Sequence, residues 1–362
     1  MPETHGRRRA ALRHSLTDAG LDALLVTDLL NIRYLTGFTG SNAAVLVHAG
    51  GDARTLFCTD GRYTTQSAAE VPDLDKVVDR ASAAALVKRA AKDAAAYGRI
   101  GFESQHVSVE EYEDLREHVE LTRTPGLVER LRLVKDEAEI DALRQACAAA
   151  DRALGDLVAA GGLRPGRTEL EVARDLENRM LEHGSSEPSF ASIVAAGAHS
   201  AIPHHRPTHA ELKRGDFVKL DFGATVDGYH SDMTRTFVLG EPADWQREVY
   251  ELVRTAQAAG VGAVAPGAEV SDVDAAARSV IAAAGRGDAF AHGLGHGVGL
   301  QIHEAPSLAA TGVGTLSAGM AVTVEPGVYL AGRGGVRIED TLVVRAGEPE
   351  LLTLSTKNLV AV

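Results

Sequence analysis

One hairpin constrains this chain more than any other segment. Residues 218–237 read VKLDFGATVDGYHSDMTRTF, two apolar runs of alternating texture on either side of Asp227 and Gly228. An Asp-Gly pair tolerates the positive φ angles that a two-residue hairpin turn requires. With these residues as the turn, Val226 pairs with Tyr229, and this pairing fixes the register of the whole hairpin.

The predicted register brings two carboxylates to one face of the hairpin. It pairs Asp221 with Thr234 and Gly223 with Asp232, and residues paired across a ladder or two apart along a strand share a face. Gly223 leaves room opposite Asp232. Two carboxylates this close repel each other unless they share a proton or hold a cation. Without further ligands, the hairpin would be a solvated edge with two ordinary aspartates.

A second hairpin near the C-terminus supplies two glutamates. VTVEPG begins at Val322 and GVRIEDT ends at Thr341, and both read as strands around a glycine-rich turn. A loop of odd length centred near Gly332 places Glu325 opposite Glu339. The sequence therefore predicts two hairpins that each present two acids.

A histidine-rich segment lies between the two hairpins. Residues 292–304 read HGLGHGVGLQIHE, and His296 completes a set of two aspartates, one histidine and two glutamates. Four anionic ligands balance the charge of two divalent cations. Oxygen donors with one imidazole suit manganese, cobalt or zinc better than a metal that prefers thiolate. The glycines here are not read as a phosphate loop, because no clear strand precedes them and no helix opens at the required spacing.

These four segments closely resemble the pita-bread metallopeptidases, in the branch of aminopeptidase P and prolidase. The resemblance covers nearly the whole chain. It implies an α/β N-terminal domain with a central mixed sheet, like that of creatinase, and an α+β pita-bread catalytic domain. It also implies a dinuclear site, most often manganese, in which Asp221 chelates one ion, His296 and Glu325 hold the other, and Asp232 and Glu339 bridge both.

The same resemblance assigns catalytic roles. A hydroxide bridging two cations would attack the peptide carbonyl, because the metals lower its pKa. Glu325 would take and return the proton, and His303 would steady the oxyanion or the substrate backbone. His204 matches a histidine that hydrogen-bonds near the scissile amide, whereas its neighbour His205 is expected to point elsewhere.

Three further residues are predicted at the site. Arg337 lies two residues before Glu339 on the same strand face, where it would orient a ligand carboxylate. His292 and Tyr329 resemble substrate-binding residues that line the site. Each also has a structural interpretation: Arg337 would offset the acids, and the other two would pack.

Length and texture predict two domains. At 362 residues the chain exceeds one typical domain, and the pattern of residues along the sequence changes near Thr124-Pro125-Gly126. We place the creatinase-like domain at residues 1–125 and the catalytic domain at 126–362. Segments 34–41 and 59–63 resemble the N-terminal domain of small bacterial aminopeptidase P-like proteins. Because this domain often leans over a neighbouring subunit's active site in the family, a homodimer is expected.

Local patterns predict the elements within each domain. In the first, helices at 4–18, 64–69 and 81–96 alternate with strands at 23–27, 43–47, 55–58 and 100–102, and the segment 34–41 is rich in turns. Ser108 and Glu111 form a capping box. In the second, the patterns predict one long helix over 128–160, a helix capped at Thr168, a strand at 189–194, and helices at 245–259 and 271–284. Helices followed by an acid-bearing hairpin occur twice, as in a pseudo-twofold fold.

Composition excludes several classes of partner. A formal net charge of −13 argues against binding nucleic acid or an anionic membrane. The start of the chain is charged and lacks an apolar signal core, and no apolar run approaches membrane-spanning length. The two cysteines, Cys58 and Cys147, form no disulfide framework and fit a reducing cytoplasm. We therefore expect a cytoplasmic protein.

Several activities are compatible with these motifs. The favoured prediction is an Xaa-Pro aminopeptidase, which acts on peptides with proline at the second position. The alternative is an Xaa-Pro dipeptidase (prolidase), which also needs a cation for the substrate's free carboxylate. Many prolidases carry an arginine just after the motif at His303, but residues 305–319 contain no Lys or Arg. The cation would then be Arg206, or Arg62 of a partner subunit.

Two other activities are less well matched. Methionine aminopeptidases share the five ligands but usually lack the separate N-terminal domain and an arginine at the position of Arg337. Relatives that act as binding modules, or as creatinase, without metal have lost ligands, and this chain retains all five.

Overall fold

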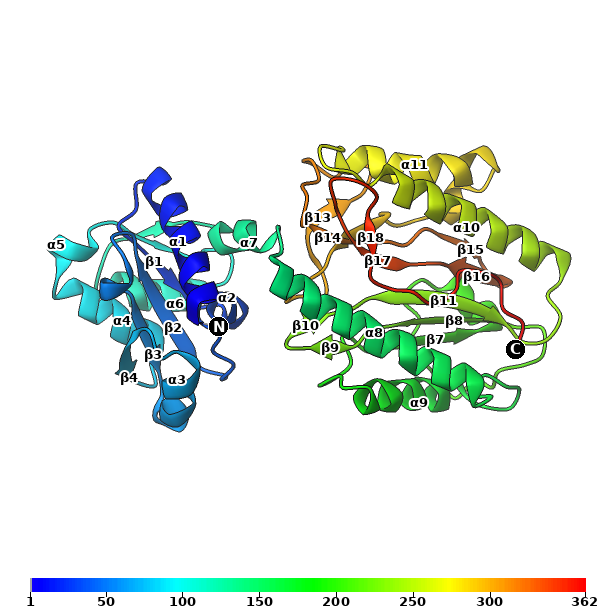
Figure 1. Ribbon diagram of the computed structural model, residues 1–362, viewed down its shortest axis with the longest axis horizontal. Coiled ribbons are helices and arrows are strands. Elements are labelled where there is room, and N and C mark those ends of the chain that lie inside the picture. The colour runs from blue at the N-terminus through cyan, green and yellow to red at the C-terminus, as the bar shows by residue number, and fades with distance from the viewer. Residues whose placement is uncertain (1) are drawn as a thin grey trace. The chain divides into compact units, whose positions relative to one another are not determined.

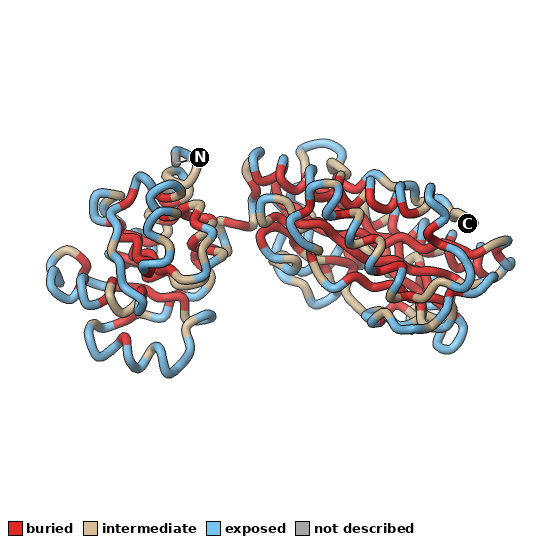
Figure 2. The backbone as a smooth tube through the Cα atoms, turned by 90° about the horizontal axis from the view of Figure 1, so that it is seen from below, coloured by how far each residue is buried: buried red, intermediate tan, exposed pale blue. Residues whose placement is uncertain are grey.

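The computed structural model describes residues 2–362, which divide into two compact units, one ending at Arg132 and one beginning at Leu133 (Figure 1). The helix α7 (Leu127–Arg132) belongs to the first unit. In both units the buried backbone runs through the interior, and most of the exposed backbone lies around it (Figure 2).

The N-terminal unit is built on a six-stranded mixed sheet in the order β4-β3-β2-β1-β5-β6. The strands are β1 (Ala23–Val26), β2 (Ala43–His48), β3 (Leu56–Thr59), β4 (Asp75–Val78), β5 (Ile100–Phe102) and β6 (Leu121–Arg123). β2 is antiparallel to both of its neighbours, and the other adjacent pairs are parallel. The expected α/β domain with a mixed central sheet is confirmed.

The helices of this unit depart from the prediction in two places. They are α1 (Pro2–Asp18), α2 (Leu29–Thr36), α3 (Thr64–Glu70), α4 (Ser82–Ala91), α5 (Ala94–Tyr97) and α6 (Val109–Arg116). The turn-rich segment 34–41 begins as the end of α2, which Asp28 caps and Gly37 terminates at φ 83°. The single helix predicted over 81–96 is wrong, because the chain breaks between α4 and α5. The Ser108–Glu111 capping box is confirmed.

The C-terminal unit repeats one order of elements twice (Figure 1). The first half contains α8 (Glu137–Ala159), α9 (Glu169–Glu182), β7 (Ile193–Ala196), β8 (Phe217–Phe222), β9 (Thr225–Val226), β10 (Tyr229–His230) and β11 (Met233–Val238). The second half contains α10 (Asp244–Ala263), α11 (Val270–Ala283), β12 (Gly295–Gly297), β13 (Glu304–Leu308), β14 (Ala321–Val324), β15 (Gly327–Leu330), β16 (Gly334–Arg337), β17 (Asp340–Val343) and β18 (Glu350–Leu351). Each helix pair packs on strands in its own apolar core, and the core of the second half also includes Phe217 and Val238 from strands of the first half.

Two expectations for this unit are corrected. The long helix predicted over 128–160 is two helices, because Asp136 forms a capping box with Glu139 that starts α8 anew. The residues before it are extended, and Val134 pairs with Met320. The strand predicted at 189–194 begins only at Ile193.

The first predicted hairpin has the expected register. Val226 pairs with Tyr229 and Asp221 with Thr234, and the turn residues have positive φ angles, 48° at Asp227 and 73° at Gly228. Glycine is required at position 223 for a different reason from the one expected. A Cβ there would lie 1.8 Å from the carbonyl oxygen of Ser231, so the close approach of the partner strand requires glycine.

The second hairpin also has the expected register. Gly327 pairs with Arg337 on one side and Val324 with Asp340 on the other. The same register runs through both ladders, so it sets Glu325 opposite Glu339.

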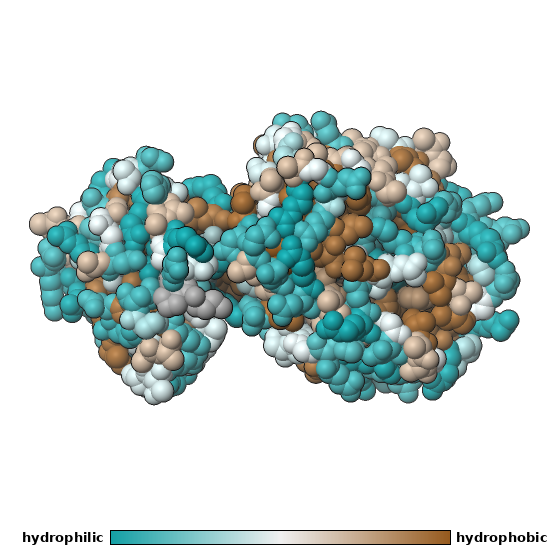
Figure 3. Space-filling view, in the orientation of Figure 1, coloured by the Kyte–Doolittle hydropathy of each residue, from teal (hydrophilic) through white to brown (hydrophobic). Residues whose placement is uncertain are grey.

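No helix in the described part of the chain is long and apolar enough to cross a bilayer. The face seen in Figure 3 is mainly hydrophilic, and apolar side chains show between the helices of the C-terminal unit.

Candidate metal centre

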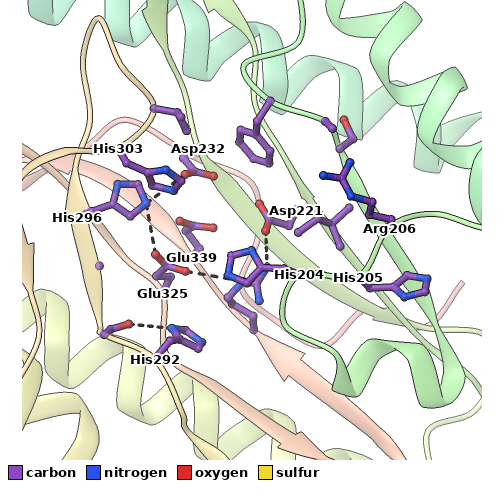
Figure 4. A pocket seen from close by; sticks show the side chains of 18 of the residues that line it. His204, His205, Arg206, Asp221, Asp232, His292, His296, His303, Glu325 and Glu339 are labelled. Atoms are coloured by element: carbon purple, nitrogen blue, oxygen red, sulfur yellow. Dashed lines mark hydrogen bonds and ion pairs between the residues drawn. The ribbon is translucent and has the colours of Figure 1, made fainter. Parts of the chain in front are cut away.

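A cavity of about 710 Å³ in the C-terminal unit brings the five predicted ligands together (Figure 4). Two of them lie on strands β8 and β12, one lies directly before β11, one directly after β14, and one between β16 and β17. In chain order the five are Asp221, Asp232, His296, Glu325 and Glu339. Two antiparallel hairpins and one strand therefore converge on a single pocket from positions more than a hundred residues apart in the sequence.

His296 is held in the orientation that a metal-binding histidine needs. Its Nδ1 lies 3.0 Å from the carbonyl oxygen of Gly297. Since a carbonyl only accepts, Nδ1 carries a proton, so the ring in its neutral form has its lone pair on Nε2. That Nε2 lies 3.5 Å from Asp232 Oδ2 and 3.5 Å from Glu325 Oε1. Such a hydrogen bond on the far nitrogen is typical of histidines that bind metals.

The pocket concentrates negative charge away from water. Burial and the neighbouring carboxylates raise the pKa of Asp232 to about 6 and that of Glu325 to about 7, and they raise the pKa of Glu339 well above its usual range. Burial opposes the charged form of His296, but Asp232 and Glu325 outweigh it and raise its pKa to about 9. A divalent cation bound in the pocket would stabilise these carboxylates in their ionised form.

Asp221 provides a direct sign that a cation fits. Its Oδ2 pairs with Arg337, whereas its Oδ1 is buried and has no hydrogen-bond partner among residues 2–362. A buried acceptor without a donor is costly. A cation in the pocket would satisfy this oxygen, so the residues present fit the divalent metals expected from the sequence.

Arg337 is a buried cation that contacts two of the acids. The residue is 2% exposed, its Nε donates to Thr234 Oγ1 at 3.0 Å, and its Nη1 donates to the hydroxyl of Tyr329 at 2.8 Å. Its Nε also lies 3.9 Å from Glu325 Oε2. The contact with Asp221 brings Arg337 against one of the predicted ligand carboxylates.

Tyr329 does not line the pocket, whereas His292 does. The Nδ1 of His292 lies 2.8 Å from the carbonyl of Gly293 and is therefore protonated, so its Nε2 accepts a hydrogen bond from the Tyr329 hydroxyl at 2.8 Å. Burial and the charge of Arg337 lower the pKa of His292 to about 4. Tyr329 thus connects Arg337 to His292, and any effect it has on substrate passes through these two residues.

His204 and His303 line the same pocket and are exposed. The ring of His303 lies edge-on to that of His296, with 4.4 Å between centroids. Burial and the charge of His296 lower the pKa of His303. Neither His204 nor His303 joins the Asp232, His296 and Glu339 cluster, whose donor atoms all lie within 4.8 Å of one another.

A second cluster beside the pocket was not predicted from the sequence. The Glu169 carboxylate is fully buried, and it lies 2.9 Å from both His199 Nδ1 and His205 Nε2. It also accepts from the backbone of Ala196 and from the backbone and hydroxyl of Thr208. Five protein donors satisfy Glu169, in contrast to the open oxygen of Asp221, so we assign it a positioning role.

Lys219 is the other unpredicted residue. It lies on β8 two residues before Asp221, and its Nζ donates to the carbonyl of Ile202 at 2.7 Å. Burial and the charge of Arg337 lower its pKa to about 6. The sequence contained a sign of this residue, because a lysine between Val218 and Leu220 interrupts an apolar strand.

An acid-rich pocket suited to divalent metals, in the second unit of a two-domain chain, is typical of a metal-binding protein. Comparison with known proteins identifies the family. Residues 141–346 match the model of metallopeptidase family M24. Residues 8–134 match the creatinase/prolidase N-terminal domain. The chain belongs to metallopeptidase family M24, which confirms the resemblance to the pita-bread enzymes.

Individual relatives cover almost the whole chain. A solved structure of an Xaa-Pro dipeptidase from Bacillus anthracis is 39% identical, with a TM-score of 0.93 over 99% of this chain and 100% of that chain. An Xaa-Pro dipeptidase from Pyrococcus furiosus is 33% identical over 95% of this chain and 97% of its own length. The structure of an X-Pro aminopeptidase from Thermotoga maritima is 32% identical, with a TM-score of 0.88 over 97% of this chain and 98% of that chain. The chain is therefore similar to a peptidase of either specificity.

Proposed function

We propose that this protein is a metal-dependent hydrolase that cleaves the bond before proline, and that it acts chiefly as an Xaa-Pro dipeptidase. The observation that carries the proposal is that the five predicted ligand residues line one pocket, in a chain 39% identical to an Xaa-Pro dipeptidase. The sequence favours the aminopeptidase, but the relatives support the dipeptidase alternative better. The X-Pro aminopeptidase relative and the lack of a cation in residues 305–319 keep the aminopeptidase as the second candidate.

The chain's own residues would divide the work as follows. Asp221, Asp232, His296, Glu325 and Glu339 would hold two divalent ions, for which we retain manganese as the prediction. Bound there, such ions supply a water of lowered pKa and polarise the scissile carbonyl. Glu325, half-buried at the pocket wall, would accept a proton and return it to the leaving amine. His204 and His303, which the ligand cluster leaves free, would donate hydrogen bonds to the substrate.

The substrate's proline explains the need for such donors. Proline has no N–H and its ring fixes φ, so the site cannot rely on a backbone donor from the residue after the cut. Acidic surroundings suit the substrate's cationic α-amine. We also retain a cytoplasmic location and a homodimer as predictions; both cysteines are buried and free, as a reducing compartment would allow.

Substrate length tests the proposal. With manganese added, alanyl-proline should be hydrolysed with a higher kcat/KM than alanyl-prolyl-alanine, and alanyl-alanine should be a poor substrate. Amino acid release measured by chromatography separates the three. Equal or faster cleavage of the tripeptide would transfer the proposal to the aminopeptidase, and a lack of cleavage of all three by the manganese-loaded protein would refute both.

The roles of the two histidines can be separated from metal binding. His204→Ala and His303→Ala should each lower kcat by about a hundredfold or more, as expected for a lost transition-state donor, while the bound metal stays at the wild-type amount. His209→Ala, at an exposed histidine outside the pocket, is the matched control. Loss of metal in either variant would instead place that histidine among the ligands.

A further inference from the structure

The segment from His204 to Thr208 presents its side chains to two different surroundings. His205 and Thr208 both bind Glu169, which is fully buried behind the pocket. Figure 4 shows His205 directed away from the acids, whereas His204 and Arg206 reach toward them. The buried carboxylate therefore fixes the loop on both sides of Arg206 and aims its guanidinium into the cavity.

Arg206 is the uncommitted cation of this pocket. Two guanidinium groups line it, those of Arg206 and Arg337. Arg337 is buried and engaged by Asp221, Thr234 and Tyr329. Arg206 is exposed, and no residue in the described range 2–362 forms an ion pair or hydrogen bond with its side chain. It is therefore free to bind an anionic group that enters the cavity.

The cavity that Arg206 lines also has apolar lining residues. Leu170, Phe190, Ile193 and Pro207 line the cavity with it. Figure 4 places Arg206 on the Asp221 side of the pocket, across from His296. A cavity that combines a guanidinium, apolar lining and an acid cluster matches the chemistry of a proline with a free carboxylate whose preceding bond lies over the acids.

We propose that Arg206 binds the terminal carboxylate of an Xaa-Pro dipeptide and so determines the preference for dipeptides over longer peptides. The inference rests on the proposed function and adds the residue that distinguishes dipeptides from longer peptides. Guanidinium and carboxylate match as a pair of parallel hydrogen bonds, which a lysine reproduces only in charge. Arg206 thus fulfils the role that residues 305–319 cannot, since they contain no cation.

The test compares substrates that differ only in the terminal charge. The manganese-loaded wild type and Arg206→Ala, Arg206→Lys and Arg206→Glu variants are assayed on alanyl-proline and on alanyl-prolinamide. Arg206→Ala should lower kcat/KM for alanyl-proline by about tenfold to a hundredfold, the value of hydrogen bonds to a charged group, and leave the amide within about twofold. Arg206→Lys should recover part of the loss, and Arg206→Glu should deepen it for the dipeptide alone.

Controls separate this inference from the proposed function. Arg164→Ala, an exposed arginine that does not line the cavity, should change neither substrate. An active wild type whose Arg206→Ala variant loses both substrates equally, or loses neither, would overturn the role of Arg206 and leave the proposed function intact. A wild type that cleaves alanyl-prolyl-alanine but not alanyl-proline would overturn the dipeptidase proposal itself, and the role of Arg206 with it.

Discussion

Replacing Asp232 or Glu339 with alanine should lower kcat/KM by about a thousandfold or more. Both residues are almost fully buried, at 4% and 1% exposure, in the middle of the acid cluster. Both belong to the predicted ligand set for two ions, so either loss would weaken the binding of metal and leave the remaining charges poorly balanced. A metal that acts as a Lewis acid stabilises a transition state by several kcal/mol, which corresponds to roughly three orders of magnitude in rate.

The measurement pairs activity with metal content. Each variant is assayed on alanyl-proline, and its bound metal is counted by elemental analysis after dialysis against manganese. Glu248→Ala, an exposed acid on α10, is the control for loss of one negative charge. Because ligand binding to the folded state raises stability, manganese should also raise the Tm of the wild type more than that of either variant. Full activity after chelation would contradict the metal requirement.

Replacing Arg337 with alanine should cost about 3–5 kcal/mol of stability, the usual effect of removing one member of a buried ion pair. Arg337 connects β16 to Asp221 on β8, and it also binds the carbonyl of Pro203 and the hydroxyl of Tyr329. Its removal takes one donor from each of these acceptors, including the buried carboxylate of Asp221, and leaves the acid cluster without its nearest fixed cation.

Urea unfolding of chelator-treated protein measures this effect without a contribution from bound metal. Arg333→Ala is the matched control, because Arg333 lies in the same hairpin but is exposed and stacks on Trp245. Its loss should cost no more than about 1 kcal/mol. A similar unfolding midpoint for the two variants would show that Arg337 is not a structural partner of the acids.

Both acid-bearing hairpins could be predicted because their signals are local. An Asp-Gly turn fixes the register of one hairpin and a glycine-centred loop that of the other. Since side chains alternate with a period of two residues, the register alone decides which carboxylates share a face. The capping boxes at Ser108 and Thr168 were equally local and are confirmed. The break before α8 followed the same rule, because Asp136 and Glu139 form a capping box that the long-helix prediction overlooked.

Contacts between distant segments depended on the tertiary structure. Glu169 lies at a helix start that the sequence predicts from Thr168 and Glu171. The local sequence does not predict that Glu169 pairs with His199 and His205. The same holds for Tyr329, whose position behind the pocket wall depends on how β15 and β16 meet Arg337. The open oxygen of Asp221 and the uncommitted guanidinium of Arg206 are likewise properties of assembled surroundings. The sequence by itself determined which residues share a strand face, because backbone periodicity is local; only the packed fold decided which polar atoms are satisfied, because their partners come from remote segments.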